Sequence, residues 1–345
     1  SSAPNPPPPP RTMKDRIIYL DYVRIIACLM VLMLHTSISE ELASQHSFFV
    51  GLKTFLTGPC VPLFFMVSGA LLLPCNNELS TGQFLRKRLK HVIFPTIFFT
   101  FLYIVLSYSR LGWIGVMKSI LSMPFTVQGQ VILWFIYPLI GLYLLTPIIS
   151  PWLRTVSKRT LQFYLLLWLV TLLYPLIGMF LEVGDNQPPN ILFYFSGYAG
   201  FFLLGYYMNK YPVSLKWLVP FAILVPFIHF GIKYSDIPAP NWQDFLNFPV
   251  AIMTAAWFGI IKFFCRNCKN ESPKVIKLST LTFGVYLLHC FVIRLCLWMF
   301  NMPILNQINN YYLLVFMVFT ISTVISFFIV WLISKLPFSK YIIGS

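Results

Sequence analysis

Long apolar segments recur along most of the chain, and short polar or charged stretches separate them. A helix crosses a bilayer core of about 30 Å with about 20 consecutive apolar residues. Several segments contain Pro or Gly, which membrane helices tolerate where neighbouring groups satisfy the freed backbone. We therefore predict an all-α polytopic membrane protein with about ten transmembrane helices. The predicted segments are Ile17–Thr36, Leu52–Leu73, Val92–Ser109, Val131–Ile149, Leu161–Leu181, Ile191–Met208, Leu215–Ile232, Phe245–Phe264, Leu281–Phe300 and Tyr311–Leu332.

The Pro-rich start of the chain stands apart from this bundle. Residues 1–12 include the run Pro6–Pro10, which favours an extended, unpacked chain. We interpret residues 1–12 as a disordered tail or an appended, non-native segment. Residues 13–340 are predicted to form one integral membrane domain, because the predicted loops are too short to hold a soluble domain of their own.

Composition supports a membrane location. Of 345 residues, 58% are hydrophobic and only 10% are charged, whereas soluble domains carry about 25% charged residues. Mean hydropathy is +0.75. These values exclude a cytosolic enzyme, a disordered protein and a disulfide-rich secreted module. The seven cysteines show no regular spacing, and the single Cys265-x-x-Cys268 pair favours packing over a metal or redox role.

The formal net charge of +15 has two interpretations, nucleic-acid binding or membrane topology. With the N-terminus in the cytoplasm, most of the 25 Lys and Arg residues fall on the cytoplasmic side, as the positive-inside rule requires. Most acidic residues then fall on the outer side. The distribution predicts that both termini are cytoplasmic and that the partner is the lipid bilayer, with no nucleic acid.

Ionisable residues inside a membrane span are costly, so each one is a candidate for function. In the first predicted helix, Arg24 and His35 are eleven residues apart, within about 20° of three full turns. Asp21 and Cys28 lie on the same face. In a purely structural interpretation, Asp21 and Arg24 form a buried ion pair. In a functional interpretation, His35 is the side chain best suited to act as a base near neutral pH.

Three further groups have both structural and functional interpretations. Tyr286 and His289 share one face of the ninth predicted helix. His289 can be interpreted as forming an interhelical hydrogen bond or as a second acid or base. Ser68, beside Gly69, is typical of close helix packing. Trp134 is typical of an interfacial aromatic belt. The His, Cys and acidic residues show no zinc-ligand spacing, so we expect no metal.

A basic cluster lies in the predicted loop before the third helix. Such clusters often only anchor topology, but basic residues at a helix start can also hold the phosphates of a cytosolic substrate. The cluster comprises Arg86, Lys87, Arg88, Lys90 and His91.

These signals together resemble the acyltransferase-3 family of membrane O-acyltransferases. Arg24, ten intervening residues and His35 are similar to the signature of the family's first helix. The other similar stretches, in the family's order, are Val61–Gly69, the basic cluster up to Pro95, Leu133–Phe135 with Leu145–Pro147, and Phe283–His289. One position departs from the family, because His91 stands where its R-x-x-R loop has a second Arg.

The resemblance implies transfer of an acyl group, usually acetyl, from acyl-CoA to a hydroxyl of a glycan or lipid-linked sugar. It implies that His35 is the base, that Arg24 holds the donor or the developing oxyanion, and that Asp21 orients Arg24. The basic cluster would bind the CoA phosphates. Ser68, Trp134, Tyr286 and His289 are then expected in the substrate pocket, with acetyl-CoA as a donor substrate and no tightly bound cofactor.

Within that family, the chain resembles most the enterobacterial-common-antigen O-acetyltransferase type, which implies polysaccharide modification at a bacterial inner membrane. The main alternative is a transporter or flippase for a sugar, lipid or small solute. Transporters often carry two similar halves, and the first helix has no charged counterpart near the sixth. A catalytically inactive sensor is a third interpretation. The sequence leaves the acceptor, the acyl length and the oligomeric state open.

Overall fold

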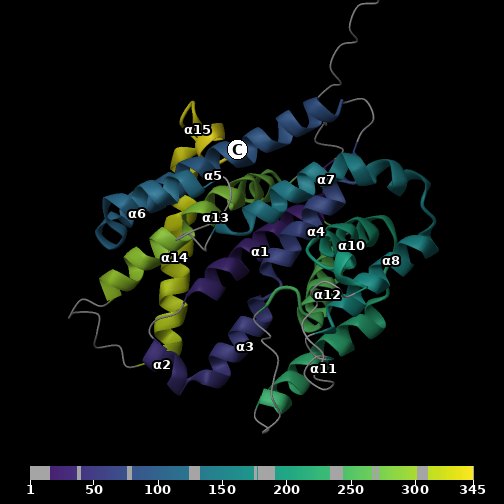
Figure 1. The fold of residues 1–345 in the computed structure, drawn as a ribbon. Helices are drawn as coiled ribbons and strands as arrows, with labels where there is room; N and C mark the ends of the chain where they lie inside the picture. The colour runs from purple at the N-terminus through teal and green to yellow at the C-terminus, as the bar shows by residue number, and fades with distance from the viewer. Residues whose placement is uncertain are drawn as a thin grey trace, which may run out of the picture.

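The computed structural model of the chain is a bundle of helices (Figure 1). It describes residues 16–36, 40–75, 80–123, 133–174, 177, 191–233, 244–265, 268, 272–300 and 310–344, and these contain no strand. The predicted tail, residues 1–12, lies outside this part. The helices are α1 (Ile18–His35), α2 (Glu40–Gln45), α3 (Ser47–Thr57), α4 (Cys60–Leu72), α5 (Thr81–Leu106), α6 (Tyr108–Ser122), α7 (Ile136–Thr155), α8 (Lys158–Thr171), η3 (Phe193–Phe195), α10 (Ala199–Lys210), α11 (Leu215–Lys233), α12 (Phe248–Cys265), α13 (Pro273–Phe300), α14 (Tyr311–Ile333) and α15 (Ser339–Ile342).

Helix α1 occupies the centre of the bundle and packs against α4, α12 and α13 (Figure 1). The short C-terminal helix α15 packs against α5. Helices α2 and α3 lie at the opposite end of the bundle from α15 (Figure 1). Residues Asp21 and His35, near the two ends of α1, therefore lie toward opposite ends of the molecule.

Local sequence explains where several helices begin and break. Ser80 and Gln83 form a reciprocal capping box at the start of α5, and Asn310 caps α14 by accepting from the Leu313 amide. Helices α3 and α4 are separated at Gly58 and Pro59, because proline has no amide hydrogen to continue the ladder of hydrogen bonds.

Helices α4 and α10 approach each other closely through two glycines. A Cβ atom on Gly69 would lie 1.8 Å from the carbonyl oxygen of Phe202, and one on Gly205 would lie 2.0 Å from that of Met66. Small residues allow membrane helices to pack backbone against backbone. The packing role expected beside Ser68 is confirmed for its neighbour Gly69.

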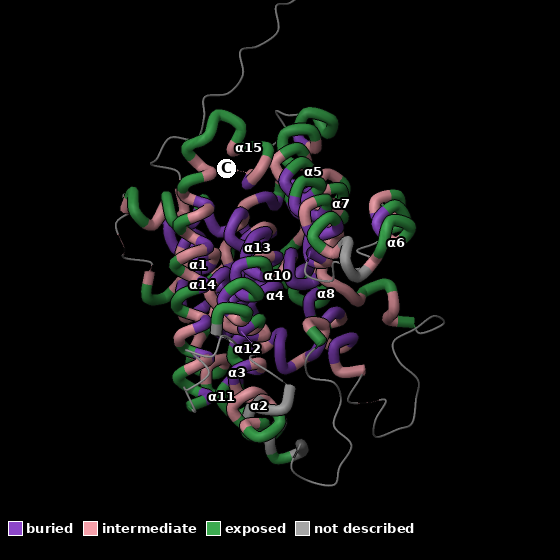
Figure 2. Tube along the Cα trace, turned by 90° about the vertical axis from the view of Figure 1, so that its left-hand side faces the viewer, coloured by how far each residue is buried: buried purple, intermediate pink, exposed green. Residues whose placement is uncertain are grey.

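Buried residues follow the middle of the bundle, around α4, α10 and α13, and the outer faces are exposed (Figure 2). Those outer faces carry large apolar side chains, for example Phe101 of α5, Ile148 of α7, Phe227 of α11 and Val324 of α14. Large exposed apolar side chains on several outer helices are suited to lipid rather than water.

Seven segments among the described residues are long and apolar enough to cross a membrane. They are Ile18–His35, Ser47–Leu72, Thr81–Leu106, Ile136–Thr155, Phe248–Cys265, Pro273–Met299 and Tyr311–Ile333. The chain is therefore an all-α polytopic membrane protein, as predicted. The fifth, sixth and seventh predicted spans contain α8, α10 and α11, which are shorter or only partly described, so the count of ten and the sidedness of the termini stay predictions.

Several predicted boundaries differ from the structure, and two of them bear on the site. The third helix begins at Thr81 rather than near residue 92, so the basic cluster is part of α5 and not of a loop. The ninth begins at Pro273 rather than near residue 281. In both cases the helix begins with polar residues, which a hydropathy pattern does not include in the apolar segment. Helix α6 was not predicted at all.

Candidate active site

Two polar stripes, on α1 and on α13, face each other in the centre of the bundle. The α1 stripe consists of Asp21, Arg24, Cys28 and His35. The α13 stripe consists of Ser279, Thr282, Tyr286 and His289, whose spacing of three and four residues places them on one helix face.

Three contacts join these stripes at successive levels. They are the Ser279 hydroxyl donating to Asp21 Oδ1 at 2.6 Å, the Cys28 thiol 3.7 Å from the Thr282 carbonyl oxygen, and the rings of His35 and His289 with centroids 5.1 Å apart. Because the residue numbers rise together on both helices, α1 and α13 run parallel. Parallel first and ninth spans agree with the predicted alternation of ten helices.

Asp21 is an anchor between elements. Its carboxylate accepts two hydrogen bonds from Arg16, at 2.7 and 2.8 Å, in addition to the bond from Ser279. The hydrogen bond to Asp21 raises the pKa of Arg16, which stays charged. The expected orientation of Arg24 by Asp21 is not supported by a hydrogen bond in the described part of the chain. Asp21 instead ties the start of α1 to α13.

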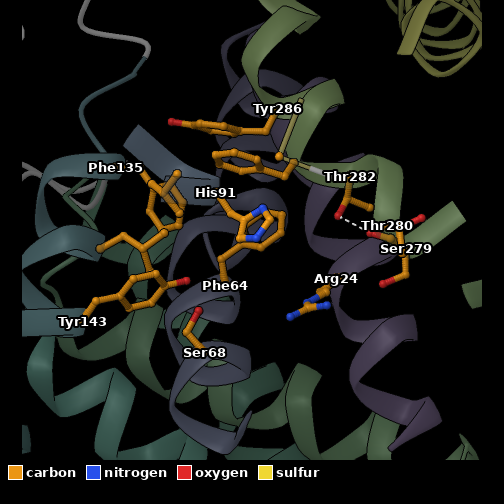
Figure 3. Close-up of a pocket in the computed structure, with 14 residues that line it drawn as sticks. Arg24, Phe64, Ser68, His91, Phe135, Tyr143, Ser279, Thr280, Thr282 and Tyr286 are labelled. Carbon is orange, nitrogen blue, oxygen red and sulfur yellow. Dashed lines mark hydrogen bonds between the residues drawn. The ribbon is translucent and has the colours of Figure 1, made fainter. Parts of the chain in front are cut away.

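A cavity of about 290 Å³ opens beside the α1 stripe, between α1, α4, α5, α7 and α13 (Figure 3). Polar side chains from several helices, aromatic rings and two aliphatic side chains line it. The lining residues include Arg24, Ser68, His91, Val92, Phe135, Tyr143, Ser279 and Tyr286.

Arg24 projects into this cavity and supplies its central positive charge (Figure 3). Arg16, Asp21 and Arg88 are near enough to act electrostatically on it. On the far wall, Ser68 of α4 lies beside Tyr143 of α7 (Figure 3). A guanidinium with neighbouring hydroxyl groups suits a ligand that carries carbonyl, amide or phosphate oxygens.

His35 does not line the cavity, but two rings of the α13 stripe connect it to that space. The Tyr286 ring lies in the cavity wall, 5.7 Å from the ring of His289, which is 5.1 Å from His35. His289 and Tyr286 are buried, whereas His35 is exposed. The predicted base therefore lies outside the cavity and is linked to its wall by two successive ring contacts.

Lys53 supports the end of α1 beside His35. Its side chain is buried, with 6% of its surface exposed, and its ammonium donates to the Thr36 carbonyl oxygen at 2.6 Å. A cation near a helix C-terminus compensates the carbonyl groups left without partners there. The hydropathy pattern did not point to this role, because Lys53 lies at the very start of the second predicted segment, Leu52–Leu73, where it was counted only as an outer-side charge.

The basic cluster divides between two faces of α5. Arg88 and His91 are three residues apart and Val92 is four from Arg88, so all three share a face. His91 and Val92 line the cavity. Arg86 and Lys90 point to the opposite face, and Lys87 lies between the two. All four Lys and Arg side chains of the cluster are exposed.

Of the four residues expected in the substrate pocket, the structure places two in the cavity wall, Ser68 and Tyr286. His289 lies behind Tyr286. Trp134 lies elsewhere, stacked on Phe245 with centroids 5.3 Å apart and close to Tyr198. Its ring packs with these aromatic residues, whereas its neighbour Phe135 reaches the cavity.

Sequence reasoning missed Ser279, Thr282 and Tyr143. The first two share the helical spacing of Tyr286 and His289, so extending that periodicity by two turns would have found them. Tyr143 has no comparable signal, because it is one tyrosine among many apolar residues of α7. His229, another ionisable residue of a predicted span, has a side chain outside the described part.

The family comparison bears on this arrangement directly. The family model of the acyltransferase domain matches residues 17–335, which include both stripes and every helix around the cavity. The chain belongs to the acyltransferase-3 family. Searches of curated proteins and of solved structures gave no significant match. The protein is therefore a multi-pass membrane acyltransferase, which favours the enzyme over the transporter interpretation.

Proposed function

We propose that this acyltransferase moves an acyl group, most simply acetyl, from acyl-CoA to a hydroxyl of a glycan or lipid-linked sugar. The observation that carries the proposal is the pair of facing stripes. They connect the Arg24 cavity, beside the basic residues of α5, to an accessible histidine at the other end of α1.

The donor half of the proposal rests on charge. Arg88 and His91 share the face of α5 that borders the cavity, and Arg24 lies inside it. Phosphates of a coenzyme A moiety would be held at the α5 end by Arg88 and neighbouring basic groups. The thioester arm would then extend along α1, with Arg24 at its carbonyl or amide oxygens. His91 replaces the family's second Arg with a weaker, non-bidentate partner, so Lys87 is expected to contribute.

The chemical step needs a base at the acceptor. His35 takes the proton of the acceptor hydroxyl while its oxygen attacks the thioester carbonyl carbon. The carbon–sulfur bond then breaks, and the proton passes to the departing CoA sulfur. The products are an O-acyl ester and free CoA thiol. Arg24 or a nearby donor group stabilises the charge that develops on the carbonyl oxygen.

The finer assignments follow from the resemblance to the enterobacterial-common-antigen type. We propose a bacterial inner-membrane location, a cytoplasmic supply of acetyl-CoA, polysaccharide modification as the outcome, and no tightly bound cofactor. The acceptor reaches His35 from the end of the bundle opposite the basic cluster.

The deciding experiment uses the purified full chain in lipid vesicles with labelled acetyl-CoA and a glycan or lipid-linked sugar extract. Mass spectrometry of the acceptor is expected to show a gain of one acetyl unit, dependent on His35. If no acceptor gains mass while a labelled solute accumulates inside the vesicles, the proposal fails in favour of transport.

A further inference from the structure

Three side chains of types that bind metals lie together where the two stripes end at His35 and His289. One ligand atom each from His35, His289 and Cys290 lies within 4.8 Å of the others. His289 and Cys290 are buried, with 0% and 6% of their surfaces exposed, whereas His35 is exposed. A cation would reach the buried pair past His35.

The hydrogen bonds of His289 leave one nitrogen ready for a metal. Its Nδ1 lies 2.5 Å from the Tyr286 carbonyl oxygen, and a carbonyl group can only accept, so Nδ1 carries the ring proton. Nε2 is then unprotonated and lies 3.1 Å from the Cys290 sulfur. Histidine ligands of metals commonly donate their second nitrogen to a carbonyl oxygen in this way.

We propose that His35, His289 and Cys290 form a binding site for a thiophilic divalent cation, Zn²⁺ in the first instance. Zn²⁺ favours nitrogen and sulfur ligands at about 2.0–2.3 Å, which places neighbouring ligand atoms about 3.3–3.8 Å apart. Binding therefore requires the three ligand atoms, now within 4.8 Å of one another, to draw together by up to about 1 Å. Mg²⁺ and Ca²⁺ require oxygen ligands, which these three side chains do not supply.

Binding would remove one proton from Cys290, because the thiolate is the ligand. The thiolate offsets part of the cation's charge, which matters because Lys53 lies close to His35. Three protein ligands leave one position for water or a substrate oxygen.

Occupancy has a consequence that rests on the proposed function. An imidazole that coordinates a metal through one nitrogen holds its proton on the other, so it cannot accept the proton of an acceptor hydroxyl. Zn²⁺ at this site therefore inhibits acyl transfer reversibly, by occupying the base.

The binding test needs no substrate. The purified, reduced full chain is stripped with a chelator and titrated with Co²⁺ as a spectroscopic probe, then with Zn²⁺. We expect one Co²⁺ per chain, a near-ultraviolet thiolate-to-metal band, and its loss as Zn²⁺ displaces Co²⁺. Cys290→Ser should lose the band and weaken Zn²⁺ binding by at least about tenfold. Cys296→Ser, a buried cysteine of the same helix, should keep both.

The second measurement follows acyl transfer, with each variant compared with its own metal-free rate. We expect Zn²⁺ to inhibit both the unsubstituted chain and Cys296→Ser, and we expect EDTA to restore their rates. Inhibition of Cys290→Ser should require a Zn²⁺ concentration at least about tenfold higher. The proposal would be overturned if the thiolate band were absent, or if Cys296→Ser lost the band while Cys290→Ser kept it. An increase in rate with Zn²⁺ would overturn it as well. If metal-free protein transfers no acyl group while the Co²⁺ band is present, the proposed function fails and the metal site stands.

Discussion

The ring of His35 lies 5.1 Å from the ring of His289, although one belongs to the first helix and the other to the penultimate long helix. This contact ends a seam of polar groups that begins at Asp21 and Ser279. The seam runs from the side of the Arg24 cavity to His35, and each of its parts can be tested separately.

Replacing His35 by Ala is expected to lower the acyl-transfer rate by about 10²- to 10⁴-fold, the range for loss of a general base. His35 is exposed, so the fold should survive, and thermal unfolding in detergent checks this. His46→Ala is the control, because His46 stacks on Tyr311 at 4.4 Å and belongs to neither stripe. Full activity of folded His35→Ala would refute the assigned base.

Arg88→Ala and Arg86→Ala should separate donor binding from membrane anchoring. Arg88 shares the cavity-facing side of α5, whereas Arg86 points away from it. A charge-assisted hydrogen bond contributes about 1.5–3 kcal/mol, so Arg88→Ala should raise the KM for acetyl-CoA about ten- to a hundredfold. Arg86→Ala should change it less than about threefold. Equal effects of the two substitutions would contradict the proposed division of the cluster.

Arg16 and Asp21 form a pair in which the carboxylate is buried and the guanidinium is one-third exposed. Arg16→Gln leaves the carboxylate with Ser279, and we expect a loss of about 1–3 kcal/mol of stability. Adding Asp21→Asn to Arg16→Gln should recover part of that loss, because no unpaired charge then remains buried. Thermal unfolding of the two singles and the double gives the coupling. Strict additivity would show that the ion pair is unimportant.

Two glycines in helices should respond in opposite ways to replacement by alanine, because only one of them lies in the contact between α4 and α10. A methyl group on Gly205 would meet the Met66 backbone, whereas Gly141 has no atom within 4 Å of an added Cβ. Gly205→Ala should lower the unfolding temperature, with a cost of about 1–3 kcal/mol for overpacking. Gly141→Ala should leave it unchanged or raise it, since Ala is the better helix former. The same scan of both variants provides the comparison.

The local pattern predicted the α1 stripe and half of the α13 stripe, Tyr286 and His289, but not the contact between the two. Asp21, Arg24, Cys28 and His35 share a face because helical periodicity is a property of neighbouring residues. The choice of α13 as their partner is set by packing between distant segments, which one sequence does not encode in any local pattern. The cluster of His35, His289 and Cys290 had no local signal for the same reason, because His35 and His289 are adjacent only after folding.

The start of α5 shows a different kind of error. The apolar segment of the third predicted helix begins only after Arg86, Lys87 and Arg88. The cluster was therefore assigned to a loop. The helix begins at its cap, Ser80 with Gln83, and this Ser-x-x-Gln pattern was present in the sequence. Capping chemistry was the better guide here, because charged residues are good helix formers.

The pairing of α1 with α13 also constrains how the molecule is made. Asp21 and Arg24 leave the ribosome more than 250 residues before Ser279 and the rest of the α13 stripe. Until α13 is made, Asp21 can pair with Arg16, but the polar face of α1 lacks its partner helix in the bilayer, where unpaired polar groups are costly. The contact between the two stripes therefore closes only after α13 has been inserted.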